Sequence, residues 1–233
     1  MNGSRKEVLG RIAEALRAPA RPAHAGHGPA KGTAKAGDHA PQFREWLPPV
    51  GPSADERLAL FSRQCAALKA EVRLCADVAG AAGQIATIAE AGGWRRLALH
   101  AGELTDAVAS KLPVSLELLR VEAAYDRDAL EASDGGLTEC ECLVAQTGSV
   151  CVTSRSSGGR ALSVLPPHHL VLARRSQLEP DLVAAYELLA RKYQGNYPSF
   201  VSFITGPSRT GDIERILVLG AHGPKWLTIL LVE

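Results

Sequence analysis

The chain alternates short apolar segments with longer segments of helical periodicity through most of its length, which limits the folds open to it. Residues 72–75 and 95–100 are short apolar runs typical of buried strands. Between them, the Ala-rich stretch 78–91 predicts a helix that ends at Gly92 and Gly93. Strands that alternate with helices form a parallel or mixed sheet with helices on both faces. The sequence therefore predicts an α/β protein and not an all-helical bundle.

Capping and turn residues place the other elements. Ser53 and Glu56 form a capping box that opens a helix. Residues 137–144 and 149–153 predict two paired strands joined by a turn at 146–148. Further helices are predicted at residues 103–110, 126–132 and 176–192, and further strands at 114–121, 170–173, 200–204, 216–219 and 227–232.

The N-terminal part of the chain differs in composition from the rest. Residues 4–17 carry apolar side chains at helical spacing and predict a short amphipathic helix. Residues 18–41 are rich in Ala, Pro, Gly, His and Lys without apolar periodicity, which predicts a flexible linker. We therefore divide the chain into a helical arm with its linker, residues 1–42, and a compact α/β domain, residues 43–233.

Charge and hydropathy disfavour some classes of partner. The 233 residues include 26 basic and 25 acidic side chains, so the formal net charge is +1 at pH 7. This balance gives no electrostatic reason to expect nucleic acid or an anionic membrane as partner. No apolar run approaches the roughly 20 residues that span a bilayer, and the N-terminus lacks the apolar core of a signal peptide. We expect a cytoplasmic protein without a membrane span.

The five cysteines give no sign of a disulfide framework or a metal site. None forms a C-x-x-C pair, and an odd number in a cytoplasmic protein argues against structural disulfides. Cys140, Cys142 and Cys151 could converge on the predicted hairpin, but three ligands on flat strands make a poor zinc cage. We expect the cysteines to be small buried residues, with no bound metal and no intrinsic iron–sulfur cluster or other cofactor.

The stretch 205–212, Thr-Gly-Pro-Ser-Arg-Thr-Gly-Asp, carries the most chemical character. Its Gly-Pro pair, directly after an apolar strand, predicts a sharp turn. Arg209 offers a planar guanidinium suited to a carboxylate or phosphate, and Ser208 and Thr210 offer hydroxyl groups. Asp212 is placed to pair with Arg209 or to cap the next turn. The stretch predicts either an anion-binding loop or a tight turn whose Ser and Thr only cap.

Three other segments carry groups that a ligand could contact. Residues 220–225 contain a titratable His222 and a charged Lys225, although Gly-Pro before a strand is also a plain turn signal. Residues 146–149 present hydroxyls and amides at a hairpin tip. His168 belongs to a rigid Pro-Pro-His-His segment, of which one or both histidines could face the same cleft.

Ligands of open α/β sheets bind beyond the carboxyl ends of strands, and we expect the three loops to lie there. The candidate ligand-binding residues are Gln146, Thr147, Gly148, Ser149, His168, Gly206, Ser208, Arg209, Thr210, Asp212, His222, Gly223 and Lys225. No catalytic residue is assigned, because an uncharged Gln is a weak general base. The sequence lacks a G-x-G-x-x-G fingerprint, a P-loop and an H-E-x-x-H helix, which disfavours nucleotide binding and zinc hydrolysis.

Five motifs follow one another along the chain, at residues 136–138, 145–149, 160–168, 204–213 and 218–225. In this order they closely resemble the LUD-domain family, densely over the C-terminal part of the chain and by layout over the rest. The resemblance implies the fold of the sugar-phosphate isomerase and CoA-transferase superfamily, a three-layer α/β/α sandwich with a mixed, mostly parallel sheet. It also favours one cleft shared by the three loops.

The resemblance further implies a role in oxidising L-lactate to pyruvate, alongside partner subunits that carry iron–sulfur clusters. In that role the chain is a non-redox component that binds a small carboxylate or phosphate-bearing ligand. Relatives often carry an acidic residue where Gln146 stands, so the chain departs from the family pattern there. Two alternatives stay open. One is a stand-alone enzyme for a phosphorylated sugar or CoA ester, using His222 or Asp212, and the other is an interaction or regulatory module without catalysis.

Overall fold

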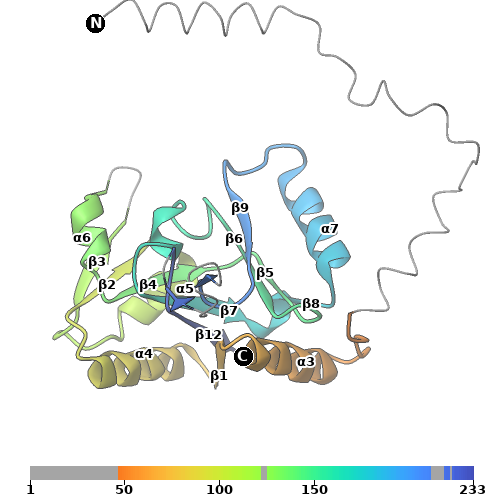
Figure 1. The fold of residues 1–233 in the computed structure, drawn as a ribbon, viewed down its shortest axis with the longest axis horizontal. Helices are drawn as coiled ribbons and strands as arrows, with labels where there is room; N and C mark the ends of the chain where they lie inside the picture. Colours follow the sequence, from red (N-terminus) through yellow and green to blue (C-terminus); the bar gives the residue numbers. More distant parts are fainter. Residues whose placement is uncertain (1–46, 122–124, 211–217, 221) are drawn as a thin grey trace, which may run out of the picture. The chain divides into compact units, whose positions relative to one another are not determined.

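The computed structural model describes residues 47–121, 125–210, 218–220 and 222–233 (Figure 1). The helix predicted at residues 4–17 and the linker at 18–41 lie outside these ranges and stay predictions. Within them, strands and helices alternate as the sequence predicts, and the chain is an α/β protein. None of the helices in the described ranges is long and apolar enough to cross a bilayer.

The largest sheet has six strands, and every neighbouring pair is parallel. The predicted mostly parallel sheet is confirmed, and mixed pairing occurs in a second sheet. In spatial order the strands are β1 (Glu71–Cys75), β12 (Trp226–Val232), β7 (His168–Arg174), β4 (Gly135–Glu139), β2 (Arg96–Leu99) and β3 (Glu117–Arg120).

A second sheet has four strands in mixed orientation. In spatial order these are β8 (Leu178–Glu179), β5 (Cys142–Val144), β6 (Ser149–Thr153) and β9 (Val201–Ile204). The antiparallel β5–β6 pair is the predicted hairpin, with Cys142 opposite Cys151. A separate antiparallel ribbon joins β10 (Arg209–Thr210) to β11 (Val218–Leu219), the described part of the strand predicted at 216–219.

Side chains of the parallel strands alternate between two cores. The helices are α3 (Ala54–Ala67), α4 (Val78–Gly92), α5 (Glu103–Ala109), α6 (Arg127–Glu131) and α7 (Leu182–Tyr193). Within β7, Leu170 and Leu172 pack with α4 and α5. Val171 and Ala173 face the opposite side, where α3 and the second sheet cover them (Figure 1). Helices on both faces of the sheet confirm the predicted layers, and burial on both faces explains why these strands are continuously apolar.

Local signals explain where several elements begin and end. The predicted capping box of α3 is present, since the Glu56 N–H donates to Ser53 Oγ at 3.2 Å and the Ser53 N–H donates to Glu56 Oε2 at 2.9 Å. α4 ends before Gly93, whose φ of 62° is the left-handed conformation that glycine adopts without strain. The cysteines are free and buried, as predicted, and α7 packs on Cys142 and Cys151 from the outer side of the second sheet.

The apolar stretch 137–144 is not one strand, and this part of the prediction is wrong. β4 ends at Glu139 in the parallel sheet, and the chain then crosses to β5 in the second sheet. Leu137 packs with α4 and α5, whereas Leu143 packs with α3. The two halves therefore belong to different cores, and no glycine or proline marks the crossing between them.

The helix predicted from Ser176 begins later than expected. The residues around Ser176 form a 3-10 turn, and the chain then extends into β8. Pro180 disfavours a helical conformation at the residue before it. α7 starts only after Asp181, whose carboxylate accepts the N–H of Ala184 at 2.9 Å.

Candidate functional site

Two of the three predicted loops line one cavity, which we call the first cleft. Its volume is about 400 Å³. The predicted site residues in its wall are Gly206, Ser208, Arg209, His222 and Gly223. The rest of the lining is Arg160, Ser163, Val164, His169, Phe200, Ser202, Ile204, Pro207, Pro224 and Leu227. The described residues of the loops at 205–212 and 220–225 therefore converge, as the sequence predicts.

Backbone contacts hold the two loops of the first cleft together. Gly206 has a φ of 84°, and a Cβ at this position would lie 3.0 Å from the carbonyl oxygen of Leu68. The Ser208 N–H donates to the Pro224 carbonyl at 2.9 Å, and the Ser208 carbonyl accepts the N–H of Gly220 at 2.9 Å. The predicted sharp turn is confirmed, and the cleft wall is fixed by its backbone.

Two arginines bring positive charge to the first cleft. Arg209 is predicted from its motif, whereas Arg160 begins another motif but is not among the predicted ligand-binding residues. The Arg160 guanidinium lies 5.3 Å from the ring centroid of Phe200, which supports it from one side. Among the described residues, neither guanidinium has a carboxylate within 4.0 Å. The described part of the cleft is thus suited to an anion.

A buried histidine also lines the first cleft. His169 is only 1% exposed, and its Nε2 lies 2.9 Å from the hydroxyl of Thr138. Its Nδ1 is buried and has no hydrogen-bond partner among the described residues. Burial, helped by the neighbouring His168, lowers the pKa of His169 to about 3. The imidazole is therefore neutral at pH 7.

The neighbouring His168, which the sequence favoured, points to the other face of the sheet. Its Nε2 lies 2.9 Å from the Thr228 hydroxyl, and its ring packs edge-on against Trp94 at 5.3 Å. Successive side chains of a strand face opposite ways, so only one of the two histidines can reach the cleft. His169 lies on the same face of β7 as Val171, which packs in the core with α3. The alternation of side chains along the strand therefore indicates from the sequence that His169, and not His168, faces this side.

The hairpin tip at residues 146–149 does not line the first cleft. The Gln146 side chain donates to the Pro48 carbonyl at 3.0 Å, and the Gly148 N–H donates to the Val144 carbonyl at 3.0 Å. The Gln146 side-chain amide and the Gly148 N–H therefore already have hydrogen-bond acceptors within the protein. The tip contacts the loop that follows β9 through hydroxyls, with Ser149 Oγ 2.7 Å from the Thr205 Oγ1.

Other predicted site residues stand apart from the cleft or outside the described ranges. Thr147 belongs to the same hydroxyl chain away from the cleft, with its Oγ1 2.7 Å from Ser149 Oγ. The Lys225 ammonium packs over Trp226, 4.8 Å from the ring centroid. Asp212 lies outside the described residues, so its pairing with Arg209 stays a prediction.

The first cleft lies at the amino ends of the parallel strands. Its wall includes His169 near the start of β7 and Leu227 near the start of β12. The loop at 220–225 leads into β12, and the loop at 205–212 leaves a strand of the second sheet. Our expectation that the loops follow carboxyl ends of the main sheet is wrong, because chain order alone did not show which sheet each strand joins.

Together these features define a class: an α/β domain with a parallel sheet of six strands, an appended mixed sheet and an arginine-lined cleft. The LUD domain matches residues 58–232, and the chain belongs to the LUD-domain family. Among the described residues, no three His, Cys, Asp or Glu side chains are grouped as metal ligands.

Relatives carry the name lactate utilization protein C, to which the chain is homologous. The protein from Anoxybacillus flavithermus is 33% identical over 114 residues, covering 48% of this chain and 50% of the relative. The one from Deinococcus radiodurans is 32% identical over 122 residues, covering 52% and 57%. The chain therefore spans about half the length of these relatives.

A solved structure shares the fold. It is a DUF162 family protein from Deinococcus radiodurans, with a TM-score of 0.63 and 26% sequence identity. The match covers 78% of this chain and the whole of that one, 100%. The likeness extends over most of the α/β domain.

Proposed function

We propose that this chain is a non-redox component of a lactate utilization system and binds a small carboxylate in the first cleft. Membership of the LUD-domain family and homology to lactate utilization protein C support the system. The observation that carries the ligand class is the presence of Arg160 and Arg209 in one cavity with the neutral His169. A partner that oxidises L-lactate to pyruvate with iron–sulfur clusters completes the proposed system.

The lining of the first cleft matches the groups of a small 2-hydroxy or 2-oxo acid. A guanidinium fork binds a carboxylate through paired charge-assisted hydrogen bonds. The neutral imidazole of His169 lines the same wall and adds a polar ring without a charge. Val164 and Leu227 offer apolar surface to a methyl group. The chain's part is to bind and orient the acid, while the partner subunits take its electrons.

Reconstitution with the partner subunits tests this proposal. The full chain is co-expressed with the iron–sulfur subunits, and lactate-dependent reduction of a dye is measured with and without it. We expect the chain to be required and Arg209→Ala to lower the rate about tenfold or more, because a charge-assisted contact is lost. Arg63→Ala, on the exposed face of α3, is the matched control and should leave the rate unchanged.

The same assay separates the proposal from its alternatives. Full dye reduction by the partner subunits without this chain contradicts the proposal. Turnover of a phosphorylated sugar or CoA ester by the chain alone would instead indicate a stand-alone enzyme. Loss of complex formation on deleting residues 1–41, with no effect of Arg209→Ala, would indicate an interaction module.

A further inference from the structure

A second hollow lies at the carboxyl end of β4, and we call it the second crevice. Its volume is about 320 Å³, and its lining includes Glu139, Glu141, Arg155, Lys192 and Tyr193. It belongs to neither of the loops that line the first cleft. None of the candidate site residues predicted from the sequence lines it.

The position of the second crevice in the sheet favours a ligand site. β2 and β4 are parallel neighbours, and the chain leaves them toward opposite faces of the sheet. After β2 it enters α5, which packs in the core with α4, and after β4 it crosses to the second sheet on the other face. Adjacent strands whose connections diverge in this way create a topological switch point, and open α/β sheets bind ligands there.

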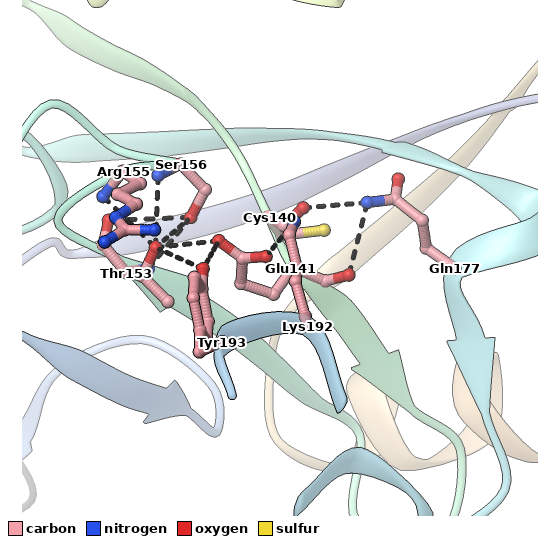
Figure 2. Close-up of polar contacts among 8 residues, drawn as sticks. All are labelled: Cys140, Glu141, Thr153, Arg155, Ser156, Gln177, Lys192 and Tyr193. Carbon is pink, nitrogen blue, oxygen red and sulfur yellow. Dashed lines mark hydrogen bonds and ion pairs between the residues drawn. The ribbon is translucent and has the colours of Figure 1, made fainter. Parts of the chain in front are cut away.

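Glu141 is the centre of the crevice, and Figure 2 shows its polar contacts. Its side chain is only 2% exposed. Oε1 accepts hydrogen bonds from the Tyr193 hydroxyl at 2.7 Å and the Thr153 hydroxyl at 2.7 Å (Figure 2). Oε2 accepts the Lys192 ammonium at 2.5 Å. The carboxylate is thus held by three donors before any ligand arrives.

These contacts fix the charge state of the cluster. Burial raises the pKa of Glu141, but hydrogen bonds from Lys192, Tyr193 and Thr153 outweigh it, so the pKa lies below its usual range. Burial and the contact with Glu141 raise the pKa of Tyr193 to about 12, so the phenol stays protonated. Glu141 is therefore ionised at pH 7 and its charge is offset by the ammonium beside it.

Glu139, the other carboxylate of the crevice, also accepts hydrogen bonds from the protein. Oε1 of Glu139 accepts the N–H groups of Leu104 and Thr105, each at 2.9 Å, in the first turn of α5. The free amides of a helix N-terminus carry partial positive charge, which suits this carboxylate. Both acidic groups of the crevice thus have donors supplied by the protein.

Arg155 is left as the positive group without a carboxylate. Its guanidinium lies 5.1 Å from the ring centroid of Tyr193 and donates to the Asn196 carbonyl at 3.2 Å. Among the described residues no carboxylate lies within 4.0 Å of it. The exposed ammonium of Lys192 and the hydroxyl of Ser156 line the same hollow. Planar guanidinium, ammonium and hydroxyl groups together suit an oxyanion.

We propose that the second crevice binds a small oxyanion, a carboxylate or phosphate group, through Arg155 and Lys192. This site is separate from the first cleft and does not depend on the proposed lactate role. The pair of Glu141 and Tyr193 positions the two cations, since it holds the ammonium by hydrogen bonding and supports the guanidinium by stacking. The hollow is polar and of a size that admits a small molecule and not a large cofactor.

Site-resolved protection of arginines tests this inference on the full chain. The protein is treated with phenylglyoxal, which modifies accessible guanidiniums, and each arginine is followed by peptide mass spectrometry. Acetate, pyruvate and inorganic phosphate are added in separate arms to distinguish the two oxyanion classes. At ten times the dissociation constant, we expect modification of Arg155 to slow about tenfold. Arg63 is the control and should react at the same rate in every arm.

Two variants keep the outcomes distinct. Arg155 protection should persist in Arg209→Gln, which removes only a first-cleft group, and Lys192→Gln should weaken it about tenfold. Equal modification of Arg155 with and without every anion overturns the inference, as does protection that disappears in Arg209→Gln. If Lys192→Gln fails to fold, Arg155→Gln replaces it. Calorimetric titration of Arg155→Gln should then show one anion-binding site fewer than titration of the chain without the substitution. Protection of Arg155 without protection of Arg209 supports this inference and contradicts the first-cleft proposal.

Discussion

The first cleft and the second crevice use charge in different ways. In the first cleft, Arg160 and Arg209 line a cavity with apolar walls and a neutral His169. In the second crevice, the charge of Glu141 is buried and already bonded to three donors. Charges that face an open cavity can be removed at little cost to folding. Removing a buried, hydrogen-bonded charge instead leaves its buried partners without that hydrogen bond, which lowers stability. The comparison predicts that substituting the exposed cations of the first cleft changes binding, whereas substituting the buried Glu141 of the second crevice changes stability.

The largest effect is expected from Glu141→Leu. The change removes the acceptor that lies 2.7 Å from both the Tyr193 and the Thr153 hydroxyl in a buried site, and leaves only longer hydroxyl–hydroxyl contacts of 3.3 Å and 3.5 Å, while the exposed Lys192 can turn to solvent. We expect the free energy of unfolding to fall by about 3 kcal/mol, as measured by urea denaturation. Glu90→Leu, on the exposed face of α4, is the matched control and should change it by less than about 0.5 kcal/mol. Equal effects of the two substitutions would contradict the account of the crevice.

The next effect is a pH dependence that comes from the first cleft. The pKa of His169 is about 3 in the folded protein, below its unfolded value, so the unfolded chain binds more protons between these values. Stability from this group is present above the unfolded pKa and is lost as the pH falls below about 6.5. From pH 7 to pH 5, the free energy of unfolding of the unsubstituted chain should fall by about 2 kcal/mol more than that of His169→Gln. Parallel unfolding curves for the two proteins over this range would show that His169 is not held neutral.

A smaller effect is expected for Arg160, the cation of the first cleft that is not among the residues predicted from the sequence. Arg160→Gln should weaken pyruvate binding in the first cleft about tenfold, because one charge-assisted contact is lost. The same substitution should leave the urea denaturation midpoint unchanged, since the side chain is exposed. A calorimetric titration measures the affinity, and Arg63→Ala serves again as control. A drop in stability with no change in affinity for pyruvate would contradict the prediction that Arg160 acts in binding and not in folding.

The smallest effect separates backbone strain from crowding at the first cleft. Gly206 and Gly195 both have positive φ, 84° and 87°, but only Gly206 has neighbours within 4 Å of an added Cβ. Each substitution by Ala should cost about 1 kcal/mol through strain, and Gly206→Ala about 1 kcal/mol more through its contact with Leu68. Denaturant unfolding compares the pair. Equal losses would mean that the loop at 206 can move away from α3.

Local patterns were enough to predict most of the fold and part of the first cleft. The capping box at Ser53, the hairpin turn at 146–148 and the turn before Arg209 depend on neighbouring residues, and each is present. The crossing within 137–144 and the late start of α7 depend on which core each segment joins, which a local pattern does not contain.

The second crevice could not be predicted for a related reason. Glu139 and Glu141 interrupt an apolar run, and these two acidic residues are the local signal in the sequence. The partners of Glu141, which are Thr153, Lys192 and Tyr193, lie 12, 51 and 52 positions away from it in the chain. The sheet brings them together, so the cluster becomes visible only in the folded chain.

Binding of pyruvate to the first cleft most directly tests whether this cavity is a carboxylate site. Calorimetric titration is carried out on the full chain carrying Arg155→Gln, so that only the first cleft keeps its arginines. We expect saturable binding at one site, and loss of that binding when Arg160→Gln and Arg209→Gln are added. An absence of binding in the first protein, or an unchanged affinity in the second, would contradict the claim.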